Sequence, residues 1–306
     1  MSSLIEQAAQ RLEQLRKAGA DIPLMTGGNA TVSPRVVEAV PPKPESKPVQ
    51  FSRKVDIDLK ALQAAGIVSP DAPRSQIADQ FRVIKRPLIR NAMGKGASVI
   101  SNGNLIMVTS ALPGEGKSFT AINLALSIAT ELDNTVMLVD ADVARPSVMS
   151  VLGLPNGPGL LDLVLDESKD LSSVLLRTNI EKLSILPSGT PHPRATELLA
   201  SDAMTRRLDD MAKRYADRII IFDSPPLLIT TESRVLASHM GQVVVVVHAG
   251  KTLQSDVLQA ISTIETCPVK LLLLNQARTD SKEGYGYGYG YGYGYGYEAE
   301  QELQQV

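Results

Sequence analysis

The residues best suited to chemistry lie together between Leu105 and Thr120, in the stretch LIMVTSALPGEGKSFT. A short apolar run is followed by a loop of small residues and then by a helical pattern, which is the order strand, loop, helix. Residues 111–118 match the phosphate-binding loop pattern, with Ala111 in place of the usual first glycine. Small residues let backbone N–H groups close around phosphate oxygens. The stretch therefore predicts a site for a nucleoside triphosphate with Mg²⁺.

The side chains of this loop have separate expected roles. Lys117 is expected to reach the β- and γ-phosphates, and Ser118 to offer its hydroxyl to Mg²⁺. A helix that begins here also points the positive end of its dipole at the phosphates. The residues expected to contact the nucleotide are Pro113, Gly114, Glu115, Gly116, Lys117, Ser118 and Phe119. An ordinary flexible turn is the alternative, and the flanking strand and helix patterns argue against it.

Acidic residues follow two other apolar runs of the strand type. Val136–Val139 leads into Asp140 and Asp142, and Ile219–Phe222 leads into Asp223. Ligands of parallel sheets bind beyond the carboxyl ends of the strands, so these acids are candidates to hold a metal ion beside the nucleotide. Either run alone could instead supply a helix cap or a turn. Acids at the ends of both runs make a metal site the better interpretation.

Strand-like runs alternate with helical patterns through the middle of the chain. The expected strands after the loop are 135–139, 183–186, 218–222, 242–248 and 269–274. Such alternation predicts a mostly parallel sheet flanked by helices on both faces, the α/β class of the P-loop NTPases.

The chain divides into four expected segments. They are an amphipathic helix at 1–18, a flexible linker at 19–70, a P-loop domain at 71–280 and a disordered, tyrosine-rich tail at 281–306. The linker is rich in Gly, Pro, Thr, Val and Lys and has no lasting period. The helix at 1–18 is either a docking element or a solubilising end.

Another amphipathic helix is predicted at 75–86, where Ile77, Phe81 and Ile84 form an apolar stripe. Pro87 is expected to stop or kink it. Between residues 74 and 95 the chain has six basic residues and one acid. This charge is either a solvated helix face or a contact surface for another subunit.

The C-terminal tract alternates tyrosine with glycine. Its tyrosines are Tyr285, Tyr287, Tyr289, Tyr291, Tyr293, Tyr295 and Tyr297. Glycine at every second position removes one packing face and raises the entropy cost of a strand, so we expect this tract to be disordered.

Charge and composition exclude several classes of protein. The formal net charge is −2, so the chain lacks the positive charge typical of nonspecific nucleic-acid binding. Cys267 is the one cysteine and no Cys/His cluster has metal-ligand spacing, which is typical of a reducing compartment. The N-terminal residues lack the apolar core of a secretory signal, and the apolar runs are only as long as strands. We therefore expect a protein that neither binds nucleic acid nor spans a membrane.

Taken together, these motifs resemble those of the bacterial tyrosine autokinases (BY-kinases) of polysaccharide export, in the CpsD/CapB type whose kinase is a separate cytoplasmic chain. Residues 109–118 resemble the Walker A loop of that family, 136–142 its second Walker motif, and 219–226 its Walker B motif. The resemblance extends over residues 75–297, because the tail resembles the family's tyrosine cluster. The arrangement is also similar to autokinases found beside exosortase (XrtA)-linked exopolysaccharide loci.

The resemblance implies an ATP- and Mg²⁺-dependent protein-tyrosine kinase. It implies catalytic roles for Lys117, Asp140, Asp142 and Arg145, metal binding by Ser118, Asp142 and Asp223, and an adenine contact by Asn275, unless Asn275 is simply a turn residue. Either Asp140 or Asp142 is the base that accepts the tyrosine proton, and Asp140 is the better candidate. The family usually has a basic residue four positions after the first Asp of this motif; here Ala144 has that place and Arg145 follows it.

The resemblance further implies self-association and regulation. Asp79, Arg82 and Lys85 stand where the family has Glu and two Arg at three-residue intervals, so they are the expected interface of a ring-like homo-oligomer. The tail tyrosines would accept phosphate between subunits, and phosphorylation would dissociate the ring. Implied partners are a membrane chain-length or export protein as activator and a tyrosine phosphatase. The kinase would be cytoplasmic, peripherally recruited to the inner face of the membrane, and would regulate exopolysaccharide polymerisation and export.

Two other functions remain open. A septum-positioning or partitioning ATPase shares the fold and the nucleotide motifs without kinase activity, but such enzymes usually have an early lysine that residues 110–113 lack. A non-catalytic scaffold would use nucleotide as a structural ligand, and the intact Lys117 and strand-end acids argue against it.

Overall fold

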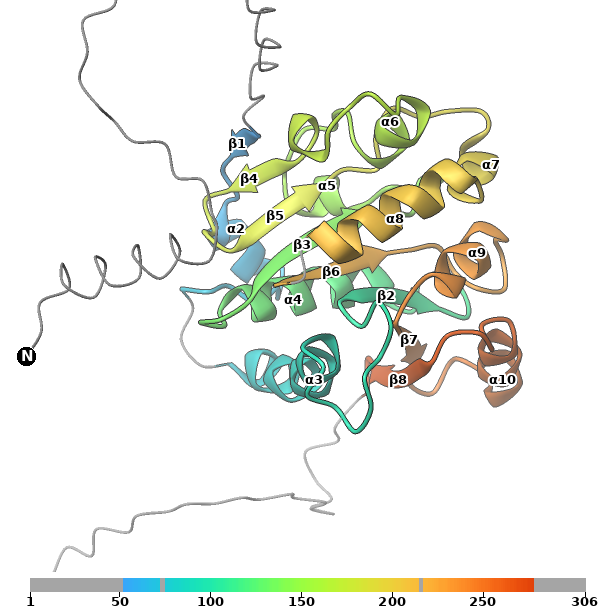
Figure 1. Ribbon diagram of the computed structural model, residues 1–306. Coiled ribbons are helices and arrows are strands. Elements are labelled where there is room, and N and C mark those ends of the chain that lie inside the picture. The colour runs from blue at the N-terminus through green and yellow to red at the C-terminus, as the bar shows by residue number, and fades with distance from the viewer. Residues whose placement is uncertain (1–51, 72–74, 215–216, 278–306) are drawn as a thin grey trace, which may run out of the picture. The chain divides into compact units, whose positions relative to one another are not determined.

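The computed structural model describes residues 52–71, 75–214 and 217–277, and the strands in them form one sheet (Figure 1). The sheet order is β1-β4-β5-β3-β6-β2-β7-β8, and every neighbouring pair is parallel except β4 and β5. The strands are β1 (Arg53–Val55), β2 (Leu105–Ser110), β3 (Thr135–Asp140), β4 (Leu176–Thr178), β5 (Leu183–Leu186), β6 (Arg218–Asp223), β7 (Gln242–His248) and β8 (Val269–Asn275). The expected mostly parallel α/β fold is confirmed.

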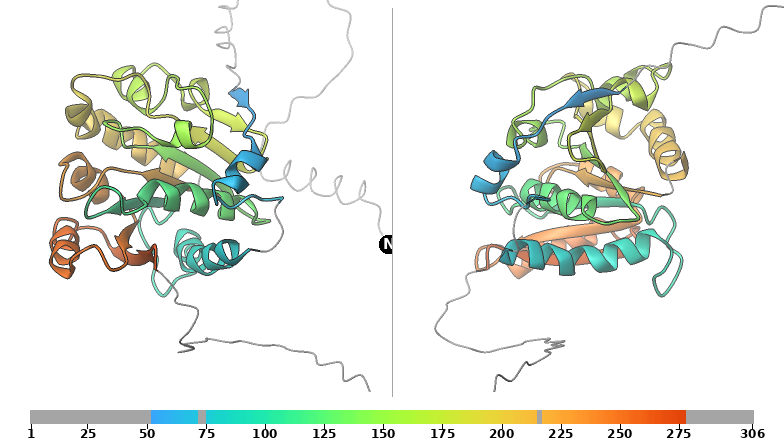
Figure 2. Two further views of the ribbon diagram at one scale, coloured as in Figure 1. Left: turned by 180° about the vertical axis from the view of Figure 1, so that it is seen from behind. Right: turned by 90° about the vertical axis from the view of Figure 1, so that its left-hand side faces the viewer.

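Helices cover both faces of this sheet (Figure 2). On one face lie α2 (Leu59–Ala64), α3 (Gln76–Ala92), α4 (Lys117–Ala129) and α5 (Val148–Val151). On the other lie α6 (Leu160–Leu165), the 3-10 turn η1 (Leu171–Ser173), α7 (Ala195–Leu199), α8 (Asp202–Arg214), α9 (Glu232–Ser238) and α10 (Gln254–Ser262). Because both faces are covered, the central strands are buried throughout and consist of long apolar runs rather than alternating patterns.

The strands expected from the sequence are all present, and most extend further than expected. β3 and β6 include Asp140 and Asp223 as their last residues, and these two residues are register partners on neighbouring strands. Asp140 and Asp223 are therefore held by the strand ladder itself, while Asp142 follows β3 as expected.

Part of the expected flexible linker is wrong, because residues from Arg53 onward belong to the domain. β1 pairs with β4, and Ile57, Leu62 and Val68 are buried. The side chain of Asn179 accepts a hydrogen bond from the Ile57 amide (2.9 Å) and donates one to its carbonyl (3.0 Å). A strand of only three residues is too short to give a hydrophobic period in the sequence. Its partner strand lies more than a hundred residues later, so no local pattern indicates the pairing.

The helix that contains Pro87 continues to Ala92 and does not stop at the proline. The Ser75 hydroxyl caps its start by accepting from the Ala78 amide (3.3 Å). Pro87 and Val83 are both exposed, so the Val83 carbonyl, which would normally accept from the amide at position 87, loses that bond on the exposed side of the helix because proline has no N–H. The helix is held past this point because Leu88 is buried against the core.

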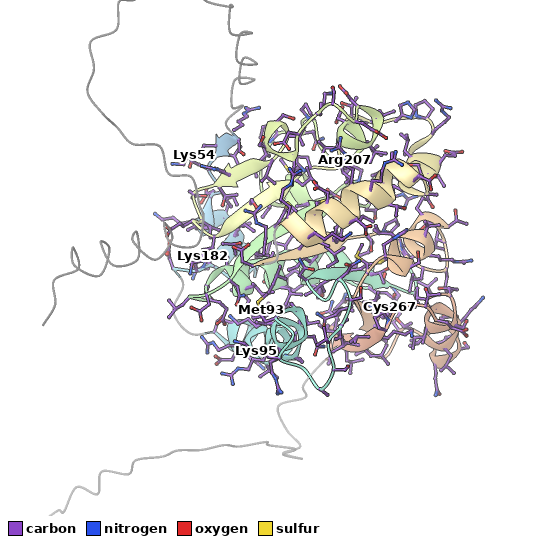
Figure 3. All side chains as sticks on the ribbon, in the orientation of Figure 1. Lys54, Met93, Lys95, Lys182, Arg207 and Cys267 are labelled. Carbon is purple, nitrogen blue, oxygen red and sulfur yellow. The ribbon has the colours of Figure 1, made fainter. Side chains whose placement is uncertain are left out.

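Helix α8 is tied to α6 by the side chain of Arg207, which Figure 3 labels above the sheet. Its Nε donates to the Leu163 carbonyl and its Nη2 to the Asp166 carbonyl, each at 3.1 Å.

Three other expectations concern the cysteine, membrane spans and the chain ends. Cys267 is a free, buried thiol. In the described part of the chain, no helix has the length and apolarity needed to cross a membrane. The expected helix at 1–18 and tail at 281–306 lie outside the described residues.

Candidate nucleotide and phosphotransfer site

The loop between β2 and α4 has the backbone that its glycines allow. Gly114 and Gly116 have φ of +81° and +94°, in the left-handed region that L side chains rarely adopt. A Cβ at Gly116 would lie 2.1 Å from Nδ2 of Asn275, whereas a Cβ at Gly114 would meet nothing within 4 Å. Gly116 is the N-cap of α4 and supplies no side-chain cap, so the first amides of the helix stay available to an anion.

Glu115 braces this loop from inside. Its side chain is buried, and its Oε2 accepts a hydrogen bond from the Leu112 amide (2.8 Å). Its Oε1 accepts from the hydroxyl of Thr252, which in turn accepts from the His248 amide (3.1 Å). The carboxylate of Glu115, expected to contact the nucleotide, therefore joins the loop to the segment after β7. Thr252 was missed, because no local pattern links it to a loop more than a hundred residues earlier.

Lys117 and Ser118 begin α4 and meet the loop that follows β3. Lys117 Nζ lies 2.8 Å from Oδ2 of Asp142, and both side chains are largely buried. The Ser147 hydroxyl donates to the Ser118 hydroxyl at 3.0 Å. The predicted phosphate lysine and the predicted metal-binding serine are thus brought beside the second Walker motif. Ser147 was another residue that the sequence patterns did not indicate.

Asp140 and Asp223 lie side by side with their carboxylates fully buried. Oδ2 of Asp140 accepts from the Val148 amide (3.0 Å). Its Oδ1 and both oxygens of Asp223 have no partner at hydrogen-bond geometry among the described residues, although the Ser118 hydroxyl lies near enough to lower the pKa of Asp223. Burial, helped by the charge of Asp223, raises the pKa of Asp140 to about 7. Burial also raises the pKa of Asp223 to about 6, against the opposing effect of the Lys117 ammonium.

Unpartnered buried carboxylate oxygens are costly unless something binds them, and a divalent cation is a ligand of the right charge. Within residues 52–71, 75–214 and 217–277, no three acidic, His or Cys side chains are close enough to hold a metal ion by themselves. Mg²⁺ usually takes only one or two carboxylates together with substrate phosphates. The donor set therefore fits Mg²⁺ bound together with a nucleotide.

The remaining expected nucleotide contacts lie around the loop. Pro113 is exposed at its rim, whereas Phe119 packs partly into the core, so only its backbone is available to a phosphate. Asn275 ends β8, and its Nδ2 donates to the Glu115 carbonyl (2.9 Å). Its adenine contact stays a prediction.

Arg145 lies beyond β3 with an exposed side chain. Its backbone amide donates to Oδ1 of Asp142 (3.1 Å), while its guanidinium forms no hydrogen bond or ion pair with the part of the chain that the structure describes. The guanidinium is therefore free to turn toward a bound phosphate, and its catalytic role stays a prediction.

The expected interface on α3 needs one correction. Lys85 is buried, with 3% of its side chain exposed; its Nζ donates to the Ser127 carbonyl (2.5 Å) and pairs with Glu131 (2.6 Å). The prediction that Lys85 contacts another subunit is wrong, because this ammonium is already bound within the chain. Arg82 and Asp79 are exposed and pair with each other on the helix surface. The tail tyrosines lie outside the described residues.

This chain is similar to known proteins over the region that contains the phosphate loop and the strand-end acids. Residues 103–273 match the family model described as an AAA domain. The tyrosine-protein kinase YwqD of Bacillus subtilis is 32% identical over 206 residues, which are 67% of this chain and 83% of that protein. The tyrosine-protein kinase CpsD of Streptococcus agalactiae is 35% identical over 170 residues, or 55% and 72% of the two chains. The crystal structure of the chimerical protein CapA2B2 matches with a TM-score of 0.57 at 28% identity, over 72% of this chain and 93% of that one.

Proposed function

Because this chain belongs to the bacterial tyrosine-protein kinases, we propose that it uses ATP and Mg²⁺ to phosphorylate the tyrosines of its own C-terminal tract. Protein-tyrosine kinase activity is the function of the family. The observation that carries the proposal is the buried Asp140–Asp223 pair, which lies beside the Lys117 loop at the carboxyl ends of neighbouring strands. Acids of raised pKa near the lysine of this loop support the proposal.

Nucleotide binding rearranges the ion pair at the loop. Lys117 now neutralises Asp142, and the β- and γ-phosphates would compete for the same ammonium. Ser118, Asp142 and Asp223 would hold Mg²⁺, which neutralises charge on the phosphates when bound. The amides that open α4 contribute fixed positive dipoles at the same point.

Asp140 is the proposed acceptor of the tyrosine proton. A tyrosine hydroxyl has a pKa of about 10, so it needs a positioned base rather than spontaneous ionisation. A carboxylate whose pKa is about 7 matches that task at neutral pH better than an ordinary one. Asp142, with its Oδ2 bound to Lys117, is less available. Arg145 is proposed to add positive charge at the transferred phosphate.

The acceptors are proposed to be Tyr285 to Tyr297, presented by one subunit to the site of the next. Glycine on both sides of each tyrosine lets the backbone enter a narrow site in many registers. Each phosphate adds about −1.5 to −2 charges, so full modification adds roughly −10 to −14. Repulsion between such tails would dissociate a ring-like oligomer assembled through Asp79 and Arg82 of α3.

The biological setting is proposed from the family. The kinase would regulate exopolysaccharide polymerisation and export, with a membrane chain-length or export protein as activator and a tyrosine phosphatase to reset it. It would be a cytoplasmic protein recruited to the inner face of the membrane. Deleting residues 1–48 and following membrane recruitment in cells tests whether the N-terminal segment contributes.

A filter assay with radiolabelled ATP tests the activity. Wild-type protein should retain label on protein, while Lys117→Met and Asp140→Asn should retain none and keep their circular dichroism spectra. Lys60→Met removes an exposed lysine and serves as the control. Mass spectrometry should place the phosphate on Tyr285 to Tyr297. Full labelling of Lys117→Met would overturn the assignment, and phosphate mainly on Tyr215 would overturn the role of the tail.

A further inference from the structure

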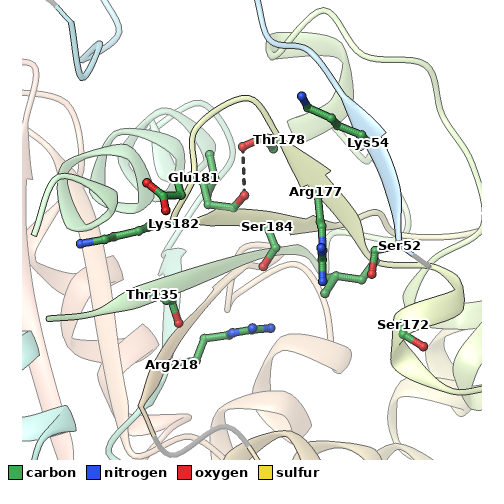
Figure 4. Close-up of a pocket in the computed structure, with 12 residues that line it drawn as sticks. Ser52, Lys54, Thr135, Ser172, Arg177, Thr178, Glu181, Lys182, Ser184 and Arg218 are labelled. Carbon is green, nitrogen blue, oxygen red and sulfur yellow. Dashed lines mark hydrogen bonds between the residues drawn. The ribbon is translucent and has the colours of Figure 1, made fainter. Parts of the chain in front are cut away.

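A cavity of about 660 Å³ lies at the opposite end of the sheet from the phosphate loop (Figure 4). Thr135 and Arg218, which line it, open the strands that end at Asp140 and Asp223. At about 3.3 Å per residue the cavity is therefore ~17 Å from the proposed metal site along the strands. It lies over the sheet face that carries α8 and is separate from the nucleotide site.

The lining of this cavity is strongly basic. It contains Lys54, Arg177, Lys182 and Arg218 but only one acid, Glu181. Lys182 is already occupied, because its Nζ donates to the carbonyls of Glu131 and Leu132 at 2.6 Å each.

Of the other cations, Arg177 and Arg218 face each other, whereas the ammonium of Lys54 points away from them (Figure 4). Lys54 and Arg177 are register partners on β1 and β4, and neither side chain has a hydrogen bond or ion pair with another residue in the described ranges. Figure 4 shows the guanidinium of Arg177 pointing toward that of Arg218 across the cavity. Two guanidinium groups that face each other repel, and an anion between them reduces that repulsion. The arrangement therefore favours a bound anion, and guanidinium groups suit the oxygens of a phosphate.

Hydroxyl groups make up much of the remaining lining. Ser172 donates to Asp170 (2.6 Å) and Ser184 to the Val136 carbonyl (3.3 Å), so both present lone pairs to a ligand. The buried hydroxyl of Thr135 has no hydrogen-bond partner within the described part of the chain. No aromatic side chain of that part lines the cavity. A nucleobase or a phosphotyrosine ring would thus find no stacking partner, whereas sugar hydroxyls would find acceptors.

From this chemistry we propose that the cavity binds a phosphorylated sugar. The phosphate lies between Arg177 and Arg218, and the sugar hydroxyls meet Ser172 and Ser184. The volume is within the range of about 300–1,000 Å³ usual for small-molecule sites, and exceeds what a lone phosphate needs. The binding site stands whether or not the chain phosphorylates itself.

Isothermal titration calorimetry of the full chain tests this proposal. Saturating Mg²⁺ and a non-hydrolysable ATP analogue first block the phosphate loop, so that added phosphates cannot bind there. Glucose 1-phosphate, galactose 1-phosphate and mannose 1-phosphate are then titrated in turn, with glucose, inorganic phosphate and phosphotyrosine as comparisons. At least one sugar phosphate should bind more tightly than all three comparison compounds.

Variants locate the site. Arg177→Gln should weaken binding about ten-fold or more, because a hydrogen bond to a charged group is lost. Arg53→Gln is the control: it removes a positive charge from β1, the strand beside β4, on the sheet face away from the cavity. This variant should bind the sugar phosphate with unchanged affinity. Both positions are exposed, and thermal unfolding confirms that each variant is folded.

The outcomes are decisive. The absence of binding by all the sugar phosphates, equal binding of inorganic phosphate, tighter binding of phosphotyrosine, or unchanged affinity in Arg177→Gln would each overturn the proposal. None of these measurements requires phosphotransfer, so their failure is distinguishable from failure of the kinase assay.

Discussion

Replacing Asp223 by asparagine is expected to stabilise the nucleotide-free protein, and to do so more at high pH than at low pH. Both carboxylate oxygens are buried without a hydrogen-bond partner in the described residues. Burial, opposed by Lys117, raises the pKa from 3.8 to about 6. Ionising this group therefore costs more in the folded protein than in the unfolded chain, and asparagine carries no such charge.

The sign and size of the effect follow from linkage. The unfolded chain loses the proton near pH 3.8 and the folded protein near pH 6, so stability is lost as the pH rises through that window and is not regained above it. The loss is about 2 kcal/mol at pH 5 and about 3 kcal/mol at pH 8. The advantage of Asp223→Asn should therefore grow by about 1 kcal/mol between these two pH values. Asp140 adds to the same trend, because burial and then the charge of Asp223 raise its pKa, and asparagine at position 223 removes the second of these effects.

Urea denaturation between pH 5 and pH 8, with a chelator and without nucleotide, measures this difference. Asp133→Asn removes an exposed acid just before β3 and serves as the matched control. Its effect on the free energy of unfolding should not show the same increase with pH. Adding Mg-ATP should stabilise the wild-type protein more than Asp223→Asn, since the variant has lost a metal ligand. A difference that stays flat across this pH range, or that shrinks as the pH rises, would refute the reasoning about the buried carboxylate.

Two further variants test the loop and the α3 helix. Gly116→Ala should weaken binding in a fluorescent-nucleotide titration more than Gly114→Ala, because its Cβ would lie 2.1 Å from Nδ2 of Asn275 and displace that amide from the Glu115 carbonyl, whereas Gly114→Ala faces open space. Both glycines have positive φ, so each change should also cost about 1–2 kcal/mol of backbone strain; equal losses in both would contradict this. Lys85→Met should lower the free energy of unfolding, measured in urea, by about 1–3 kcal/mol and leave the mass seen by light scattering unchanged. Arg82→Glu should instead reduce that mass at low salt. An Arg82→Glu protein of unchanged mass would count against the α3 interface.

The nucleotide site could be predicted from the sequence because its determinants are contiguous. Gly114, Gly116 and Lys117 form a local pattern whose backbone geometry depends on the absence of a Cβ, and the structure finds both glycines at positive φ. The parallel sheet was also predictable, since strands covered on both faces must be apolar along their whole length. Asp140 and Asp223 were candidates for the same reason, as the acids that end such runs.

A closer reading of the sequence could have placed Lys85. It lies four residues after Phe81 and three before Leu88, on the apolar side of the helix, so helical periodicity predicts its burial. The resemblance to the family had instead suggested a position in a subunit interface. Lys85 can be buried because its aliphatic chain packs in the core while its ammonium donates to the Ser127 carbonyl and pairs with Glu131.

Other features depend on contacts between residues far apart in the chain, and only the tertiary structure decided them. The order of strands makes Asp140 and Asp223 neighbours, and their shared burial raises both pKa values. Thr252 reaches Glu115 only because β7 lies next to β2. The pairing of β1 with β4 brings Lys54 beside Arg177 and forms the basic cavity, although neither short strand has a pattern of its own. Local residue types determined the chemistry available to this protein, and the pairing of distant strands determined which of those groups meet.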